Sequence, residues 1–387
     1  MKKSVAILGS TGSIGKTLLK ILEKDKKNFK IVLLTAHKSH QSLLSQAIKF
    51  NVKNLIITNK ESYEILIKKT KNIKINIYNN YNNFNKFFKN KINYSMSSIS
   101  GIAGLEPTIK IIKFTKKIAI ANKESIICGW NLIKKELKKN KTEFVPVDSE
   151  HFSMWYGLKG IKTTNIEKIF LTASGGPFYK KPLKDFKKIK VSQALKHPNW
   201  KMGKKISTDS ATLINKVYEV IEAKNIFNIN YKKIEILIHP KSYVHAILKF
   251  NNGLTKIIVH DTTMKVPIFN TLYSNNQMKL NSKKINIKLL NNLNFKSVNS
   301  KIFPMINLLN FLPNNNSLFE TVIVAANDKL VELFLDKKIR FIDIQKILFR
   351  LIKSKEFTIF KQKYPNNIQD IIDLNHYVRL KISQNNI

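Results

Sequence analysis

Short apolar runs alternate with helix-like segments over the first part of the chain. Three of these runs predict buried strands, at residues 4–9, 29–36 and 54–58. The leucines of "KTLLKILEK" recur at helical spacing soon after the first run. Strand and helix patterns continue to alternate as far as "EFVPVDSEH". This alternation predicts an α/β fold with a Rossmann-like, doubly wound parallel sheet over residues 1–148.

The pattern changes in the following segments. The runs "KIFLTASGGPF", "KIEILIHPKSYVHAILKF" and "LTKIIVH" are strand-like, whereas residues 208–227 predict one long helix. We therefore expect a central α+β domain over residues 149–273. Residues 274–300 are polar and rich in Asn, which is typical of a linker. Helical spacing returns in residues 301–387 and predicts a small C-terminal helical bundle.

The charge of the chain changes this picture little. Lys and Arg number 68 against 25 Asp and Glu, which gives a formal net charge of +43. Such an excess can indicate nucleic-acid, membrane-surface or acidic partners. Here, however, lysine is spread through every segment together with Asn and Ile, and no basic stripe with interleaved aromatic residues stands out. We therefore expect no specific nucleic-acid partner and attribute the charge to composition.

The single cysteine and the hydropathy of the chain bear on its location. Cys128 leaves no possibility of a disulfide framework within the chain, which fits a reducing compartment. We expect Cys128 to be a small buried apolar residue and not a nucleophile. No apolar run reaches the ~20 residues that a membrane-spanning helix needs. The sequence predicts a cytoplasmic protein without a membrane partner.

A glycine-rich turn follows the first predicted strand in "LGSTGSIG". Its glycines are Gly9, Gly12 and Gly15, and the hydroxyl residues between them are Ser10, Thr11 and Ser13. This G-x-x-G-x-x-G spacing matches the dinucleotide fingerprint only loosely. Glycines nevertheless let the backbone approach a pyrophosphate, and the following helix offers unpaired N–H groups. A plain strand–helix turn is the alternative, but we favour a dinucleotide site.

The end of the second predicted strand indicates which dinucleotide is bound. NAD enzymes usually place an acid about 20 residues beyond the glycines, where it holds the ribose 2′-hydroxyl. The stretch "TAHKSHQ" contains no acid but contains His37, Lys38 and Ser39. A lysine and a serine would favour a 2′-phosphate, which a carboxylate would repel. The sequence therefore predicts NADPH, although Lys38 could be one more lysine of a lysine-rich chain.

Three carboxylates from two segments form a candidate metal site. Asp148 and Glu150 lie two apart at the end of a predicted strand, where alternation would place both on one side. Glu219 lies on the predicted long helix, on one face with Asn215 and Lys216. Three oxygen ligands suit Mg²⁺, Mn²⁺ or Co²⁺. From spacing alone, a solvated strand end explains the Asp-x-Glu pair better than a metal does.

Two further stretches have features of a substrate site. "LTASGGPF" contains a flexible, donor-rich turn at Ser174. "HPNWKMGKKIS" carries His197, Trp200 and Met202 and is broken by a proline and a glycine. A loop with a large aromatic side chain can close over a substrate and exclude water. Alternatively, Trp200 fastens the loop to its own domain. Lys123 follows a predicted sheet strand in "ANKES", and ligands bind at the carboxyl ends of such strands.

Taken together, these motifs resemble the 1-deoxy-D-xylulose 5-phosphate reductoisomerase family. The stretches that carry the resemblance are "LGSTGSIG", "GIAGLEPT", "ANKES", "PVDSEH", "SGGPF", "HPNWKMGKKIS", "DSATLINK", "IHPKSYVH" and "AAND". They occur in the family's order and cover nearly the whole chain. The resemblance implies an NADPH domain, a central catalytic domain with a mobile flap at about residues 174–204, and a C-terminal helical domain. It also implies a homodimer with one divalent cation per site.

The resemblance implies a role for each matching position. The implied metal ligands are Asp148, Glu150 and Glu219, and Lys123 and His197 complete the implied catalytic set. The implied substrate contacts are Ser149, Ser174, His197, Trp200, Ser210, Asn215 and Lys216. The implied cofactor contacts are Gly9, Ser10, Thr11, Gly12, Ser13, Ile14, His37, Lys38, Ser39, Asn122, Lys123, Glu124, Met202, Gly203 and Met264.

The resemblance also implies a reaction, the NADPH-dependent and metal-dependent conversion of 1-deoxy-D-xylulose 5-phosphate to 2-C-methyl-D-erythritol 4-phosphate. That step supplies isoprenoid precursors. The chain departs from the family pattern at His37, where glycine is usual, and before Met264, where a Pro-Asp pair is absent. Rival interpretations are a dehydrogenase of the aspartate-semialdehyde or homoserine type and a nucleic-acid-binding protein. The dehydrogenase interpretation leaves the carboxylate cluster without a role. For the nucleic-acid interpretation we expect only weak, unspecific binding.

Overall fold

The computed structural model describes residues 2–200, 202–273 and 278–384. The chain forms two compact units. The first comprises Met1–Ser125, Asn131–Asp148 and Met264–Asn281, and the second comprises Ile126–Trp130, Ser149–Thr263 and Ser282–Ile387. The predictions at Met1, at Lys201 and at residues 274–277 and 385–387 lie outside the described residues. The predicted domain boundaries stay a prediction.

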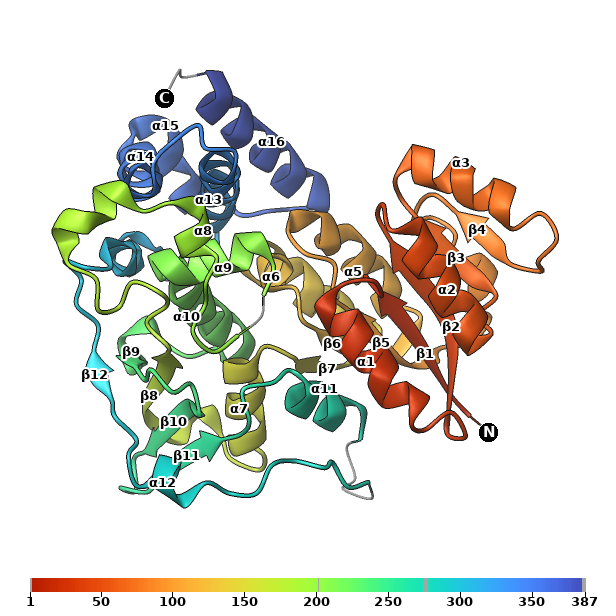
Figure 1. Ribbon diagram of the computed structural model, residues 1–387, viewed down its shortest axis with the longest axis horizontal. Helices are drawn as coiled ribbons and strands as arrows, with labels where there is room; N and C mark the ends of the chain where they lie inside the picture. Colours follow the sequence, from red (N-terminus) through yellow and green to blue (C-terminus); the bar gives the residue numbers. More distant parts are fainter. Residues whose placement is uncertain (1, 201, 274–277, 385–387) are drawn as a thin grey trace. The chain divides into compact units, whose positions relative to one another are not determined.

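The first unit is built on a parallel sheet, which confirms the predicted fold class. Within the described residues its order is β4-β3-β2-β1-β5-β6-β7, and every neighbouring pair is parallel. Its strands are β1 (Lys3–Leu8), β2 (Phe29–Ala36), β3 (Asn54–Ile57), β4 (Asn76–Tyr78), β5 (Ile92–Ser97), β6 (Thr115–Ile120) and β7 (Glu143–Pro146). The order reverses beside β1, which is where doubly wound sheets bind ligands. Figure 1 shows the glycine turn leading from β1 into α1.

Helices cover this sheet as the apolar strands require. They are α1 (Ser13–Glu23), α2 (His40–Phe50), α3 (Lys60–Lys69), α4 (Phe84–Phe87), η1 (Ile102–Gly104), α5 (Leu105–Ile112), α6 (Lys123–Lys139, shared with the second unit) and α11 (Lys265–Leu272). Strands buried on both faces read as continuous apolar runs, and Val5, Ile7 and Leu34 lie in one core with α1 and α11. α11 returns from late in the chain. It is held there by Tyr94, whose hydroxyl lies 2.8 Å from the Thr271 hydroxyl.

The second unit contains a mixed sheet. Among the described residues its order is β11-β10-β8-β9-β12, in which only β8 and β9 are parallel. Its strands are β8 (Ile166–Ala173), β9 (Ile234–Ile238), β10 (Val244–Phe250), β11 (Thr255–Val259) and β12 (Lys296–Ser297). The sheet packs on helices α7 (Ser149–Gly157) and α10 (Ile214–Phe227) through a core that includes Met154, Leu171 and Val220.

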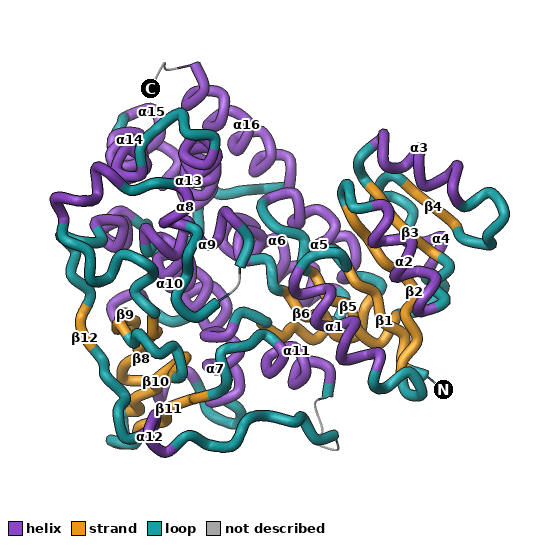
Figure 2. The backbone as a smooth tube through the Cα atoms, viewed as in Figure 1, coloured by secondary structure: helices purple, strands orange, loops and turns teal. Residues whose placement is uncertain are grey.

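The rest of the second unit is mainly helical, as Figure 2 shows in purple for the elements labelled α13 to α16. Its other helices are η2 (Thr163–Asn165), η3 (Leu183–Lys188), α8 (Val191–Ala194), α9 (Lys204–Thr212), η4 (Tyr231–Lys233), α12 (Ile287–Leu290), η5 (Pro304–Phe311), α13 (Phe319–Leu335), α14 (Phe341–Lys353), α15 (Lys355–Thr358), η6 (Ile359–Gln362) and α16 (Ile368–Gln384). α13 packs against both α14 and α16. This arrangement confirms the predicted C-terminal helical region. None of the helices in the described residues is both long enough and apolar enough to span a membrane.

Two local predictions were wrong. The long helix over residues 208–227 is two helices, because Leu213 adopts a left-handed conformation (φ +65°) between α9 and α10. Glu150 lies in the first turn of α7 and not on a strand. Within the expected linker, whose bounds stay a prediction, the chain forms α12 and β12, and β12 pairs with β9 at the sheet edge.

Candidate active site

Three carboxylates converge where α7 begins. Asp148 precedes α7, Glu150 lies in its first turn, and Glu219 lies on α10. One ligand oxygen from each lies within 4.8 Å of the others. Asp148 and Glu150 were predicted to lie together by alternation along a strand. No strand is formed there, but the start of α7 brings the two side chains together. Converging carboxylate oxygens are the donors that Mg²⁺ and Mn²⁺ prefer, so this set fits a divalent cation.

Two lysines lie against these carboxylates. Lys216 Nζ lies 2.8 Å from Glu150 Oε1 and 2.5 Å from Glu219 Oε2, and it donates to the Thr172 carbonyl at 2.7 Å. Lys123 Nζ lies 2.9 Å from Asp148 Oδ2. Burial opposes ionisation of Glu150, but the charge and hydrogen bond of Lys216, together with His245 and the Ser149 hydroxyl, outweigh burial and lower the pKa of that carboxyl. Burial alone would lower the pKa of Lys216, but the negative charges of Glu150 and Glu219 raise it.

Helix α10 holds its carboxylate through neighbours on one face, as its spacing predicted. Asn215 Nδ2 donates to Glu219 Oε1 at 2.5 Å. The ring of His151 lies beside the same residue, with Nε2 2.8 Å from the Glu219 carbonyl oxygen and Nδ1 3.8 Å from Glu222 Oε2. Asp148, His151 and Glu222 also bring ligand atoms within 4.8 Å of one another. Sequence reasoning missed His151 and Glu222, although Glu222 follows Glu219 by one helical turn.

His197 links the glycine-rich turn after β8 to the segment that carries Trp200. Its Nε2 lies 3.0 Å from Ser174 Oγ, and its Nδ1 accepts the backbone N–H groups of Asn199 and Trp200 at 3.2 and 3.0 Å. Burial and the charge of Lys216 lower the pKa of His197 to about 4. The ring is therefore neutral at pH 7. Because Nδ1 accepts, Nε2 carries the proton and donates to Ser174.

The predicted flap segment rests on the second unit's own loop. Asn199 Nδ2 donates to the Pro240 carbonyl at 2.6 Å and to Ser242 Oγ at 2.7 Å. Trp200 meets His245 edge to face at 6.4 Å between ring centroids, and His245 stacks on His260 at 3.7 Å. Sequence reasoning missed Asn199. These contacts agree equally with a closed flap and with a structural role for Trp200.

The glycine turn in the first unit has the close packing that glycine permits. Gly9 has a φ of +83°, and a Cβ on Gly15 would lie 2.5 Å from the Ser10 Cα atom. Ser10 is fully buried, and its hydroxyl lies 2.7 Å from Gln46 Oε1. That hydroxyl was expected to be a donor to a phosphate, but in the structure it contacts Gln46 inside the fold. Gly12 and Ser13, by contrast, are exposed at the start of α1.

The other predicted cofactor residues have mixed surroundings. His37, Lys38 and Ser39 are exposed at the end of β2. Asn122 caps α6, because its Oδ1 accepts the Ser125 N–H at 2.6 Å. The remaining predicted positions were Thr11 and Ile14 in the turn, buried Glu124 on α6, half-buried Met264 before α11, and Met202 and Gly203 before α9. The roles of all these residues remain predictions.

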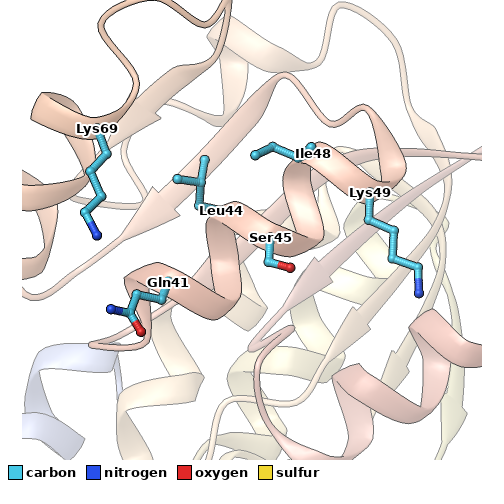
Figure 3. A pocket seen from close by; sticks show the side chains of 6 residues that line it. All are labelled: Gln41, Leu44, Ser45, Ile48, Lys49 and Lys69. Carbon is cyan, nitrogen blue, oxygen red and sulfur yellow. The ribbon is translucent and has the colours of Figure 1, made fainter.

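A pocket in the first unit lies elsewhere. Gln41, Leu44, Ser45, Ile48 and Lys49 line it from α2, and Lys69 adds to it from α3 (Figure 3). It contains none of the predicted site residues. Ile48, on its wall, is 60% exposed.

The chain matches known proteins along its length. Models of the 1-deoxy-D-xylulose 5-phosphate reductoisomerase family match residues 5–129 (the reductoisomerase domain) and residues 144–227 and 260–381 (two C-terminal domains). The reductoisomerase of Pelagibacter ubique (strain HTCC1062) is 60% identical over 98% of this chain and 99% of its own. That of Clostridium tetani is 36% identical over the same share of both chains.

Solved structures agree with this match. A reductoisomerase in complex with NADPH, fosmidomycin and magnesium has a TM-score of 0.91 at 28% identity, covering 99% of this chain and 98% of its own. The Zymomonas mobilis enzyme in complex with NADPH has a TM-score of 0.86, also at 28% identity, covering 98% of both chains. The chain belongs to the 1-deoxy-D-xylulose 5-phosphate reductoisomerase family.

Proposed function

We propose that this protein converts 1-deoxy-D-xylulose 5-phosphate to 2-C-methyl-D-erythritol 4-phosphate with NADPH and a divalent cation. The observation that carries the proposal is the convergence of Asp148, Glu150 and Glu219 within 4.8 Å. A dehydrogenase that only transfers hydride does not require such a cluster. A rearrangement of a hydroxy-ketone does, because negative charge develops on oxygen as the carbon skeleton changes.

The three carboxylates would hold the cation. A bound Mg²⁺ or Mn²⁺ supplies Lewis acidity toward the substrate's oxygens. Lys123, against Asp148, presents a positive charge beside this cluster and would stabilise charge developing on a substrate oxygen. Ser149 Oγ lies 2.6 Å from Glu150 Oε2, so it orients that carboxylate and can also contact substrate.

A second group of side chains would bind the phosphate end of the substrate. Its members are Ser174, His197, Ser210, Asn215 and Lys216. Neutral His197 donates from Nε2, and hydroxyl, amide and ammonium groups are suitable donors to phosphate oxygens. Binding energy from a non-reacting phosphate can be used for orientation and for closure of the segment that carries Trp200.

In the first unit, the turn after β1 would bind the pyrophosphate of NADPH at the start of α1. Exposed Lys38 and Ser39 would receive the 2′-phosphate, since no acid stands at the end of β2. Reduction would follow rearrangement, with hydride passing from NADPH to the aldehyde so formed.

We further propose a homodimer. β11 is an edge strand, and Leu254 and Ile257 on its hairpin are 66% and 47% exposed. Exposed edge strands with apolar side chains commonly pair with another chain. A cytoplasmic location remains a prediction from the sequence.

An NADPH oxidation assay tests the function. The purified protein should oxidise NADPH only when both the pentulose phosphate and Mg²⁺ or Mn²⁺ are present, and a chelator should stop turnover. NADPH oxidation with aspartate semialdehyde, or turnover in chelator, would refute the proposal.

A further inference from the structure

A buried polar cluster joins helix α13, in the C-terminal region, to helix α9. Asn327 Nδ2 donates to Asp209 Oδ1 at 2.8 Å. Lys205 Nζ lies 2.9 Å from Asp209 Oδ2 and 3.0 Å from Asp328 Oδ1. Asp209 is 1% exposed and Asn327 is fully buried. Each oxygen of the buried Asp209 carboxylate thus has its own donor, and one of these donors, Asn327, comes from α13.

The same cluster also contacts α10. Lys205 Nζ lies over the ring of Tyr218, 5.4 Å from its centroid. One ammonium therefore touches α9, α10 and α13. A buried carboxylate is costly unless its oxygens are bonded, so this arrangement fixes where α9 lies against α13.

The position of α9 matters because of what surrounds Asp209. Ser210 is the next residue. α9 ends at Thr212, and Leu213, with its left-handed backbone, is the one residue between α9 and α10. Asn215 and Lys216 then stand in the first turn of α10. A one-residue connection transmits a displacement of α9 directly to these side chains.

We propose that Asn327 is a positioning residue for the phosphate-binding group. It acts through Asp209, which holds Ser210 and the first turn of α10 in place, and it does not touch substrate itself. This gives a role to the "AAND" stretch of the C-terminal region. The inference rests on the proposed function, because it takes Ser210, Asn215 and Lys216 as the phosphate contacts.

The test compares four variants of the full chain. N327A removes the donor, and D209N/N327D exchanges the two side chains so that one amide and one carboxylate still face each other. S210A tests the phosphate contact itself, and D336A is a control at the exposed end of α13. The measurements are KM for the pentulose phosphate, kcat, and the Kd for NADPH.

N327A should raise KM by about 10-fold or more while kcat changes much less, as expected when a buried acceptor loses its donor. The exchanged pair should recover most of that loss, and D336A should leave KM unchanged. The Kd for NADPH should be unaffected in every variant. Should N327A fail to fold, N327L removes the same donor with a side chain of similar size, and its KM should rise in the same direction.

Three results would overturn the inference. They are an unchanged KM in folded N327A, an exchanged pair no better than N327A, or an equal loss of NADPH affinity. S210A shows whether the positioning role of Asn327 or the proposed function itself has failed. If S210A raises KM and N327A does not, only the positioning role is wrong. If S210A has no effect on KM, the phosphate assignment itself is wrong.

Discussion

At the scale of single residues, the candidate site combines the negative charges of three carboxylates with the positive charges of two lysines. Lys216 contacts both Glu150 and Glu219, and Lys123 contacts Asp148. Acidic side chains gathered this closely repel one another, so positive charge must lie among them. The structure offers two overlapping sets of possible ligands, since His151 and Glu222 also approach Asp148.

Glutamine substitutions decide between these two sets. E219Q should weaken Mn²⁺ binding by more than about 100-fold, beyond the loss typical of an outer-shell partner, because a charged ligand is removed. E222Q, one helical turn away, should weaken it far less. Titration calorimetry with Mn²⁺ measures both, and NADPH affinity should be retained in both. A larger effect for E222Q would assign the metal to His151 and Glu222 instead.

At the scale of elements, the glycine turn contains one glycine that the fold requires and another whose surroundings leave it available for cofactor binding. A Cβ on Gly15 would clash at 2.5 Å with the backbone of Ser10, whereas a Cβ on Gly12 would meet the Gly9 carbonyl at an ordinary 3.5 Å. The two positions therefore make different demands, although both are glycines of one motif.

We expect G15A to destabilise the first unit, by roughly 1–3 kcal/mol, since overpacking forces the backbone to move. G12A should fold normally but bind NADPH at least about 10-fold more weakly, because its methyl group would stand where a pyrophosphate approaches the backbone. Urea unfolding and NADPH fluorescence titration measure the two effects. Normal NADPH binding by G12A would remove the pyrophosphate from this turn.

Helix α13 carries an acid that makes stability depend on pH. Glu320 is fully buried, and its Oε2 accepts from the hydroxyl and the backbone N–H of Ser317 at 2.6 and 3.0 Å. Burial raises the pKa of Glu320 to about 7 from 4.5. Between these values the folded state binds more protons than the unfolded state, so stability falls as pH rises through this window.

E320Q should remove that dependence. At pH 8 it should be more stable than the wild type by about 3 kcal/mol, and at pH 4.5 nearly equal to it. Urea midpoints at the two pH values measure this, with E235Q on the exposed face of β9 as control. Equal effects of E320Q at both pH values would show that Glu320 does not titrate in this range.

At the scale of the whole molecule, the proposed homodimer depends on the edge of the second unit's sheet. The sheet of the second unit ends at β11, where Leu254 and Ile257 face solvent in a single chain. Water contact with such side chains is removed when two edges pair.

From the proposed homodimer we expect a dimeric wild type and a monomeric L254D/I257D variant. Light scattering after size-exclusion chromatography measures the mass. I285D, at an equally exposed isoleucine outside the sheet, is the matched control and should stay dimeric. A dimeric L254D/I257D variant would place the interface elsewhere.

The sequence by itself determined the elements whose signals are local. Apolar runs predicted β1, β2 and β3, which lie in the buried core of the first sheet, and helical spacing predicted that Asn215, Lys216 and Glu219 share a face. The motifs also carried the family resemblance.

Only the tertiary structure decided how separate segments meet. It placed Glu150 on a helix, broke the predicted long helix at Leu213, and brought Asn327 to Asp209 across more than a hundred residues. It also turned the Ser10 hydroxyl toward Gln46. The physical reason is that these outcomes depend on which distant side chain satisfies a buried polar group, and periodicity along a chain holds no information about that partner.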